Sequence, residues 1–246
     1  MSVILVEGGR KLSGAVTVQG AKNSVLPMLA ATVLCPGVCC LRGCPALSDV
    51  DTAVQIIRHL GGTVHREGPD LVVDTRQITG CEIPEELMGR MRSSVMFLGA
   101  ILGRCGEAVC SQPGGCDLGP RPIDLHLYAL RAMGAEIEEK SGRLRCRGAA
   151  LHGAEIFLRT PSVGATENAI LAACAASGTT VISNAAREPE IMELQDFLRA
   201  MGACVQGAGS ATVVVEGRKK LHGCTHRVRP DRIVAATYLC AAAGAG

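Results

Sequence analysis

Met201-Gly202-Ala203-Cys204-Val205 occurs three times in this chain in slightly different form. The other copies are Leu60-Gly61-Gly62-Thr63-Val64 and Met133-Gly134-Ala135-Glu136-Ile137, so the pattern recurs at spacings of about 70 residues. In each copy a glycine directly follows the last apolar residue of a helical pattern, which is typical of a helix C-cap that turns the chain into a strand. The repetition predicts three copies of one structural unit.

Each copy is embedded in the same order of predicted elements. An amphipathic helix precedes the pattern, since Ile191, Leu194 and Leu198 fall on one helical face. Upstream of it a strand such as Thr179–Ser183 is expected. Short strands that close each copy are predicted at 71–73, 144–146 and 213–215. Helices of small apolar residues that open each copy are predicted at about 22–34, 90–104 and 165–177.

These elements predict a mixed α/β fold, an inside-out α/β barrel of three β-α-β-α-β-β repeats. The small-residue helices are apolar nearly all round, so we expect them at the buried centre with the sheets outside. Residues 21–229 are predicted to form this complete domain.

The two ends of the chain are expected to belong to a second, incomplete domain. Residues 1–20 carry strand patterns at 3–6 and 15–18, and residues 230–246 form an apolar helix as a return segment. Because that helix stops in mid-pattern, we expect a truncated chain whose ends expose apolar surface and associate or lack order.

The composition argues against several classes of protein. A net charge of +2 in 246 residues does not favour a nucleic-acid surface, and no apolar run is long enough to span a membrane. The 13 cysteines are odd in number, in a long chain without a signal peptide, which favours reduced thiols and a cytoplasmic protein. A zinc site is the alternative for one cluster, but its spacing is unusual and Val38–Leu41 is typical of a strand, so no metal is expected. That cluster consists of Cys35, Cys39, Cys40 and Cys44.

A glycine-rich loop between Pro113 and His126 carries the candidate chemistry. Three glycines and three prolines indicate an ordered loop with special backbone geometry. Arg121 and the first amide groups of the helix that follows would bind a phosphate or a carboxylate. A cation nearby makes the thiol of Cys116 easier to ionise. The alternative is a surface turn with an incidental cysteine.

Two further cations point to an anion. Lys22 and Arg92 stand at the starts of corresponding buried helices in successive repeats. A cation adds to the positive end of a helix dipole and is unfavourable there unless an anion binds. The alternative is that each is a solvated surface charge.

The sequence resembles a known family, the UDP-N-acetylglucosamine 1-carboxyvinyltransferases, which are enolpyruvyl transferases of bacterial peptidoglycan synthesis. The resemblance extends over essentially the whole chain. The motifs that carry it are Gly20–Asn23, Met91–Ser94, the Cys116 loop through His126, Pro161–Asn168, Asn184–Glu190 and Pro230–Ile233.

The resemblance implies transfer of the enolpyruvyl group of phosphoenolpyruvate to the 3-hydroxyl of UDP-N-acetylglucosamine, without a cofactor. It implies that Cys116 protonates C3 of phosphoenolpyruvate and is the target of epoxide antibiotics such as fosfomycin. It implies that Lys22, Arg92 and Arg121 hold the phosphate and carboxylate of phosphoenolpyruvate.

The resemblance also implies the residues that bind the nucleotide sugar. Ser162 serves there as a helix N-cap as well. His126 is either a further site residue or a histidine on a helix surface. Asp231 and Arg232 steady the interdomain hinge or the substrate. The implied sugar-nucleotide residues are Asn23, Arg121, Pro122, Ile123, Asp124, Leu125, Ser162, Val163 and Gly164.

Two alternatives to an active enzyme remain. The resemblance implies that members of the family have two such domains. The part of the second domain that has no counterpart in this sequence supplies a proposed general base and further arginines. The chain could therefore be an inactive fragment that only binds UDP-sugar. An RNA 3′-phosphate cyclase on the same repeat is a remote alternative, because its catalytic histidine motif is not found here.

Overall fold

The computed structural model describes residues 3–9, 11–114, 122–148 and 150–245. Three groups of helices and strands follow one another along the chain. The first group consists of α1 (Lys22–Thr32), β1 (Val38–Arg42), α2 (Ser48–His59), β2 (Thr63–Glu67) and β3 (Asp70–Asp74).

The second and third groups repeat this order. The second contains α3 (Glu85–Arg90), η1 (Arg92–Met96), α4 (Phe97–Cys105), β4 (Glu107–Ser111), α5 (Asp124–Ala132), β5 (Glu136–Lys140) and β6 (Arg143–Arg147). The third contains β7 (Glu155–Phe157), α6 (Val163–Ala175), β8 (Thr179–Ser183), α7 (Pro189–Ala200), β9 (Cys204–Gln206) and β10 (Thr212–Glu216). The chain continues through β11 (Thr225–Arg227) to α8 (Arg232–Ala245).

The repeated glycine pattern does what the sequence predicts. Gly61, Gly134 and Gly202 each follow the end of a helix with φ of 103°, 90° and 94°. This left-handed region is open to glycine at little cost, and it reverses the chain into β2, β5 and β9.

Each group forms one sheet, and the strand order explains how the domain closes. The sheets run β11-β1-β3-β2, β4-β6-β5 and β7-β8-β10-β9. In the third sheet β7 lies parallel to β8, and in the second a single parallel bridge from Glu82 to Val109 takes the same place. In the first sheet that place is filled by β11, which lies parallel to β1. The last strand of the chain therefore completes the first unit.

The strands predicted at 3–6 and 15–18 are wrong. The structure has no strand at either position, and Val3, Leu5 and Val16 are largely exposed. The strand patterns at 3–6 and 15–18 thus predicted strands for which the described residues offer no partner.

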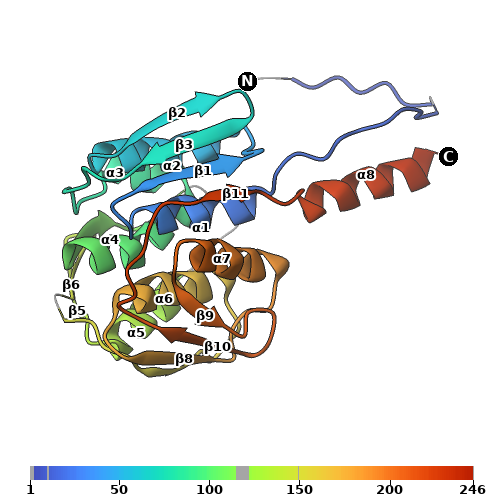
Figure 1. Cartoon of the computed structure of the whole chain (residues 1–246). Coiled ribbons are helices and arrows are strands. Elements are labelled where there is room, and N and C mark those ends of the chain that lie inside the picture. Colours follow the sequence, from blue (N-terminus) through green and yellow to red (C-terminus); the bar gives the residue numbers. More distant parts are fainter. Residues whose placement is uncertain (1–2, 10, 115–121, 149, 246) are drawn as a thin grey trace.

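The centre of the domain is helical, and the sheets surround it (Figure 1). Helices α1, α4 and α6 pack against one another, and most residues of α1 and α6 are buried. Small residues permit the close approach: a Cβ on Gly99 would lie 2.5 Å from Oδ1 and 2.6 Å from the backbone oxygen of Asn168. The predicted central helices are thus confirmed, although the middle one begins as the 3₁₀ turn η1 after an extended Met91.

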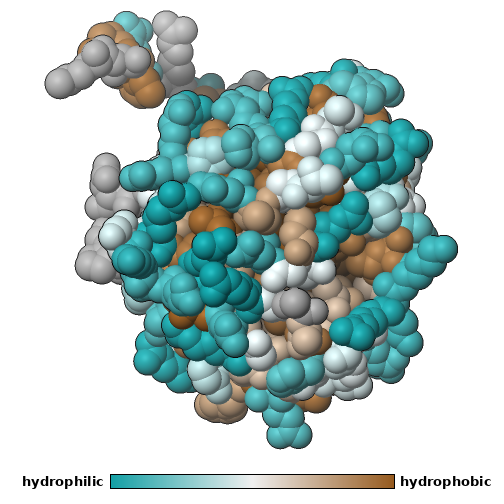
Figure 2. Space-filling model, turned by 90° about the vertical axis from the view of Figure 1, so that its left-hand side faces the viewer, coloured by the Kyte–Doolittle hydropathy of each residue, from teal (hydrophilic) through white to brown (hydrophobic). Residues whose placement is uncertain are grey.

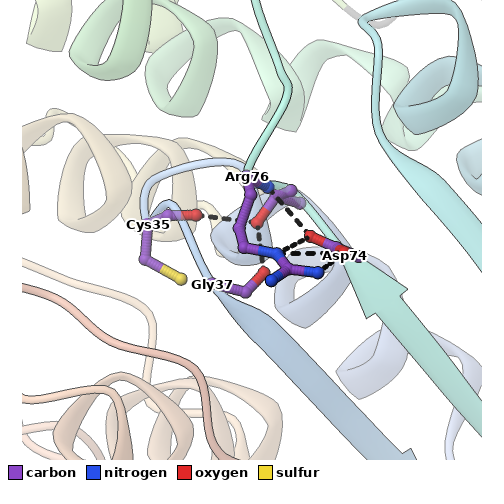
Figure 3. A network of polar contacts seen from close by, with 5 residues as sticks. Cys35, Gly37, Asp74 and Arg76 are labelled. Atoms are coloured by element: carbon purple, nitrogen blue, oxygen red, sulfur yellow. Dashed lines mark hydrogen bonds and ion pairs between the residues drawn. The ribbon is translucent and has the colours of Figure 1, made fainter.

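A polar network joins the first unit's central helix to its sheet (Figure 3). The Thr75 hydroxyl lies 2.7 Å from the Cys35 carbonyl oxygen and 3.0 Å from that of Gly37. At the end of β3 the Arg76 guanidinium donates to both carboxylate oxygens of Asp74. The Thr75 hydroxyl thus serves two carbonyl groups of the turn that connects α1 to β1.

The arm formed by the N-terminal segment and α8 projects from this body (Figure 1). No residue of α8 is buried. A cavity of about 710 Å³ between the two parts of the arm is lined mainly by apolar side chains, including Leu12, Val16, Tyr238 and Leu239. The predicted exposure of apolar surface at both ends is confirmed for the described residues. The side of the body turned away from α8 carries hydrophilic side chains around several apolar patches (Figure 2).

None of the helices in the described part of the chain has the length and apolar character needed to cross a bilayer.

Candidate functional site

A pocket of about 530 Å³ lies where the three central helices begin. The starts of α1, η1 and α6 line it together with the beginning of α5. Its lining residues are Asn23, Leu26, Arg92, Ser93, Val95, Met96, Pro122, His126, Ser162, Val163, Gly164 and Glu167.

Helix starts give this pocket a positive character. The first amide groups of a helix have no partner within the helix, and the helix dipole adds partial positive charge there. At α1 the Asp231 carboxylate accepts from the Lys22 amide at 3.3 Å, and at α6 the Ser162 hydroxyl accepts from the Ala165 amide at 3.4 Å. The N-cap residues of α1 and η1, Ala21 and Met91, provide no side-chain cap of their own. Arg92 adds a full charge and donates to the Pro122 carbonyl oxygen at 3.4 Å. The arrangement suits a phosphate or a carboxylate.

Gly164 lets α5 approach the start of α6. A Cβ at this position would lie 3.1 Å from Cε1 of His126, which is tighter than an ordinary contact. The absence of a side chain therefore brings the His126 ring directly against the first turn of α6. The sequence resemblance names Gly164 but gives no such reason for the glycine.

His126 is buried, which excludes a position on a helix surface. Its Nδ1 lies 3.1 Å from Nδ2 of Asn168, whose amide group donates the hydrogen bond. The proton of the neutral ring is then on Nε2. Burial, together with the positive charge of Arg92, lowers the pKa of His126 to about 4. The ring is therefore neutral at pH 7 and offers a hydrogen-bond donor beside the pocket.

Glu167 is a pocket residue that the sequence did not single out. It stands inside the matched motif Pro161–Asn168, where an acid in a helix that is otherwise apolar is the available signal. The side chain lines the pocket but is only 2% exposed. Burial, reinforced by the negative charges of Glu190 and Glu188, raises the pKa of Glu167 well above its usual range.

Lys22 lies next to the pocket without lining it. Its Nζ is 3.0 Å from a carboxylate oxygen of Asp49, and its backbone amide donates to Asp231. Asp231 also accepts from the amides of Ile233 and Val234, so it caps α8. The predicted cation at this helix start is thus neutralised by a protein carboxylate in this structure.

Arg232 makes a two-pronged ion pair with Glu190, with distances of 2.9 and 3.1 Å. The pair joins the start of α8 to the start of α7 and lies outside the pocket lining. This geometry gives Arg232 a structural connection between the arm and the body.

The residues after the glycine-rich loop are divided between pocket and core. Pro122 lines the pocket, Ile123 is buried at the start of α5, and Asp124 pairs with Arg159. Leu125 packs against the core. Cys116 and Arg121, on which the loop prediction depends, lie outside the described residues.

No group of three or more metal-ligating side chains arranged to hold an ion is found within the ranges that the structure describes.

Fold and pocket together define an α/β protein of repeated units whose central helices begin around one pocket suited to an anion. The chain matches the family EPSP synthase (3-phosphoshikimate 1-carboxyvinyltransferase) over residues 6–246. It therefore belongs to this family of enolpyruvyl transferases.

Curated relatives narrow the relationship. The chain is 54% identical over 243 residues to UDP-N-acetylglucosamine 1-carboxyvinyltransferase 2 of Caldanaerobacter subterraneus subsp. tengcongensis, covering 99% of this chain and 58% of the relative. It is 49% identical over 249 residues to the protein of the same name from Streptococcus thermophilus, covering 100% of this chain and 59% of the relative. The chain is a homologue of these proteins and spans less than two thirds of their length.

Solved structures agree on the fold. The enolpyruvyl transferase NikO from Streptomyces tendae matches with a TM-score of 0.84 at 27% identity, over 95% of this chain and 56% of that one. EPSP synthase from Acinetobacter baumannii matches with a TM-score of 0.75 at 22% identity, over 94% and 53%. The chain thus has the enolpyruvyl transferase fold and corresponds to about half of each full-length structure.

Proposed function

We propose that this chain supplies one side of the active site of a UDP-N-acetylglucosamine 1-carboxyvinyltransferase, a cytoplasmic enzyme of peptidoglycan synthesis. The observation that carries the proposal is the pocket at the starts of α1, η1 and α6, which combines Asn23, Arg92 and Ser162 with the first amide groups of these helices. The names and identities of the curated relatives support the choice of substrate.

The proposed reaction adds the 3-hydroxyl oxygen of UDP-N-acetylglucosamine to C2 of phosphoenolpyruvate. The hydroxyl loses its proton and C3 gains one; phosphate then leaves C2, and C3 gives a proton back. In this scheme Cys116 is the acid toward C3, because a thiol exchanges protons near neutral pH. No step requires a cofactor.

Binding in this scheme is a matter of neutralising charge. Arg92, Arg121 and Lys22 would hold the phosphate and carboxylate of phosphoenolpyruvate, with Lys22 exchanging Asp49 for the ligand. The nucleotide sugar would use Asn23 and the α6 start with Ser162, Val163 and Gly164 for its diphosphate. The segment Pro122–Leu125 would border the uridine.

Asp231 and Arg232 are proposed as hinge residues. Asp231 connects the starts of α1 and α8, and Arg232 connects α8 to α7. Any partner domain carried by α8 would be held through these contacts. The proposed full active site needs such a domain, as the length of the relatives indicates.

Labelling by fosfomycin tests this proposal. The chain is incubated with fosfomycin, with and without UDP-N-acetylglucosamine, and analysed by intact mass and peptide mapping. One adduct, on Cys116 and formed faster with the nucleotide sugar, is the expected result. No adduct, or scattered adducts over the 13 cysteines, would contradict a half-site in this chain.

A second candidate is a chain that binds UDP-sugar without turnover. It is favoured by the share of the relatives covered, 58% and 59%. Phosphate release from phosphoenolpyruvate in the presence of UDP-N-acetylglucosamine separates the two: turnover supports the enzyme, and binding without turnover supports the second candidate.

A further inference from the structure

One carboxyl oxygen of Glu167, Oε1, is enclosed and has no hydrogen-bond partner among the residues that the structure describes. The buried glutamates of α7 differ in this respect. Glu190 pairs with Arg232, and Glu193 accepts from the Arg229 amide at 2.7 Å. Leaving a buried carboxyl group unpaired costs stability, so its presence at the pocket calls for a partner that a ligand can supply.

The position of Glu167 on α6 directs it toward the pocket. Val163 and Gly164 lie four and three positions earlier in the helix, which places them on the same helical face. Helical side chains lean toward the N-terminus of their helix, so the carboxyl group lies over the first turn of α6. Glu167 lines the pocket together with these two residues.

The charges around Glu167 favour its neutral form. Glu190 on α7 and Glu188 just before it repel a negative charge at this position, and burial opposes ionisation further. Arg232 pairs with Glu190 and not with Glu167. Within the pocket, Arg92 is the cation on η1, and His126 on α5 is neutral at pH 7. A neutral acid, unlike a carboxylate, can share a pocket with a phosphate.

We propose that Glu167 is a ligand-binding residue that acts as a neutral carboxylic acid and donates its O–H to a phosphate oxygen of the nucleotide sugar. The inference deepens the proposed function and rests on it. It assigns the first amide groups of α6 to the charge of the diphosphate, and Glu167 to a hydrogen bond that only an acceptor group can receive. The contact selects for oxygen-rich, anionic ligands.

Carbon-13 NMR of the chain labelled at glutamate Cδ tests the contact. The Glu167 signal is identified by its loss in Glu167→Gln and followed during titration with UDP-N-acetylglucosamine at pH 7. The same titration is carried out by calorimetry on Glu167→Gln, Glu167→Leu and the control Glu193→Gln. Glu193 is buried and hydrogen-bonded outside the pocket, so the control reports general loss of packing.

The expected signal is that of a protonated carboxyl group, shifted by the ligand without becoming ionised. Glu167→Gln keeps a donor and should bind within about twofold of the wild type, whereas Glu167→Leu should bind about tenfold more weakly. Glu193→Gln should lower Tm and leave the affinity unchanged.

Three results would overturn the inference. An ionised Glu167 at pH 7 contradicts it even if every substituted protein fails to fold. Binding by the wild type without a shift at Glu167, and with equal affinity in Glu167→Leu, contradicts it while the proposed function stands. Absence of any binding by the wild type contradicts the proposed function and the contact together.

Discussion

Helices α6 and α8 are both rich in alanine and apolar nearly all round, yet the molecule treats them oppositely. Ten of the 13 residues of α6 are buried, whereas none of α8 is. Helix α6 packs against α4, α5 and α1, while α8 projects beside the N-terminal segment. An apolar composition favours burial of a helix, but whether the helix is buried depends on the elements that pack against it.

The two cavities differ in the same way. The larger, in the arm, is lined mainly by apolar side chains and offers no helix start. The smaller, in the body, collects helix amides, an arginine, a buried histidine and a buried acid. Chemistry for a charged ligand lies in the smaller cavity, so volume is the poorer guide to the site.

Gly99→Ala should produce the largest effect on stability, because it disturbs the close packing of α4 against α6. Helix α8 has no such packing. The new Cβ would meet Oδ1 and the backbone oxygen of Asn168, neither of which can move freely. We expect a loss of about 3 kcal/mol in the free energy of unfolding, measured with urea.

Gly244→Ala on α8 is the matched control, since nothing lies within 4 Å of its Cβ position. It should leave stability unchanged or raise it slightly. Equal effects of the two substitutions would break the contrast between α6 and α8.

The pH dependence of stability should sharpen the contrast between the two cavities, because His126 is buried beside the pocket in the body. Its pKa is lowered from 6.5 to about 4 in the folded protein, so between these values the unfolded chain binds the extra proton. Stability is fully present above pH 6.5 and is lost as the pH falls toward 4. From pH 7 to 5 this histidine should account for about 2 kcal/mol.

His126→Gln tests that value by urea unfolding at both pH values, because the variant should lose that much less stability than the wild type. The exposed His65 provides the control, and His65→Gln should behave as the wild type does. A wild-type and a His126→Gln protein with the same pH dependence would contradict a buried, neutral ring.

Leu239→Lys on α8 should give the smallest change in stability. Leu239 is 71% exposed, so the free energy of unfolding should stay within about 0.5 kcal/mol of the wild type. The substitution places a charge in an exposed apolar surface and should reduce concentration-dependent self-association in sedimentation velocity. Unchanged self-association would contradict a contact between molecules through this face of α8.

The sequence predicted the three units well because their signals are local. Gly61, Gly134 and Gly202 each need a left-handed backbone, and that need is visible in the residue itself. The strands at 3–6 and 15–18 were wrong because a strand depends on a partner, and no strand of the described residues pairs with either segment.

The site was predictable only where a motif named it. Six residues that the resemblance implies, Asn23, Arg92, Pro122, Ser162, Val163 and Gly164, all line the pocket. That they bind a ligand stays a prediction. Lys22 does not line the pocket, because Asp49, from the following helix, reaches its ammonium group. Glu167 was missed because its burial and the unpaired Oε1, as seen among the described residues, are properties of the packed helices.

The most direct test of the pocket as the binding site is an amide NMR titration of the chain with UDP-N-acetylglucosamine. We expect the largest shifts at Asn23, Ser93 and Gly164, at the three helix starts, and no shifts at Ala15 and Leu239 in the arm cavity. Shifts confined to the arm cavity, or none at all, would contradict the account.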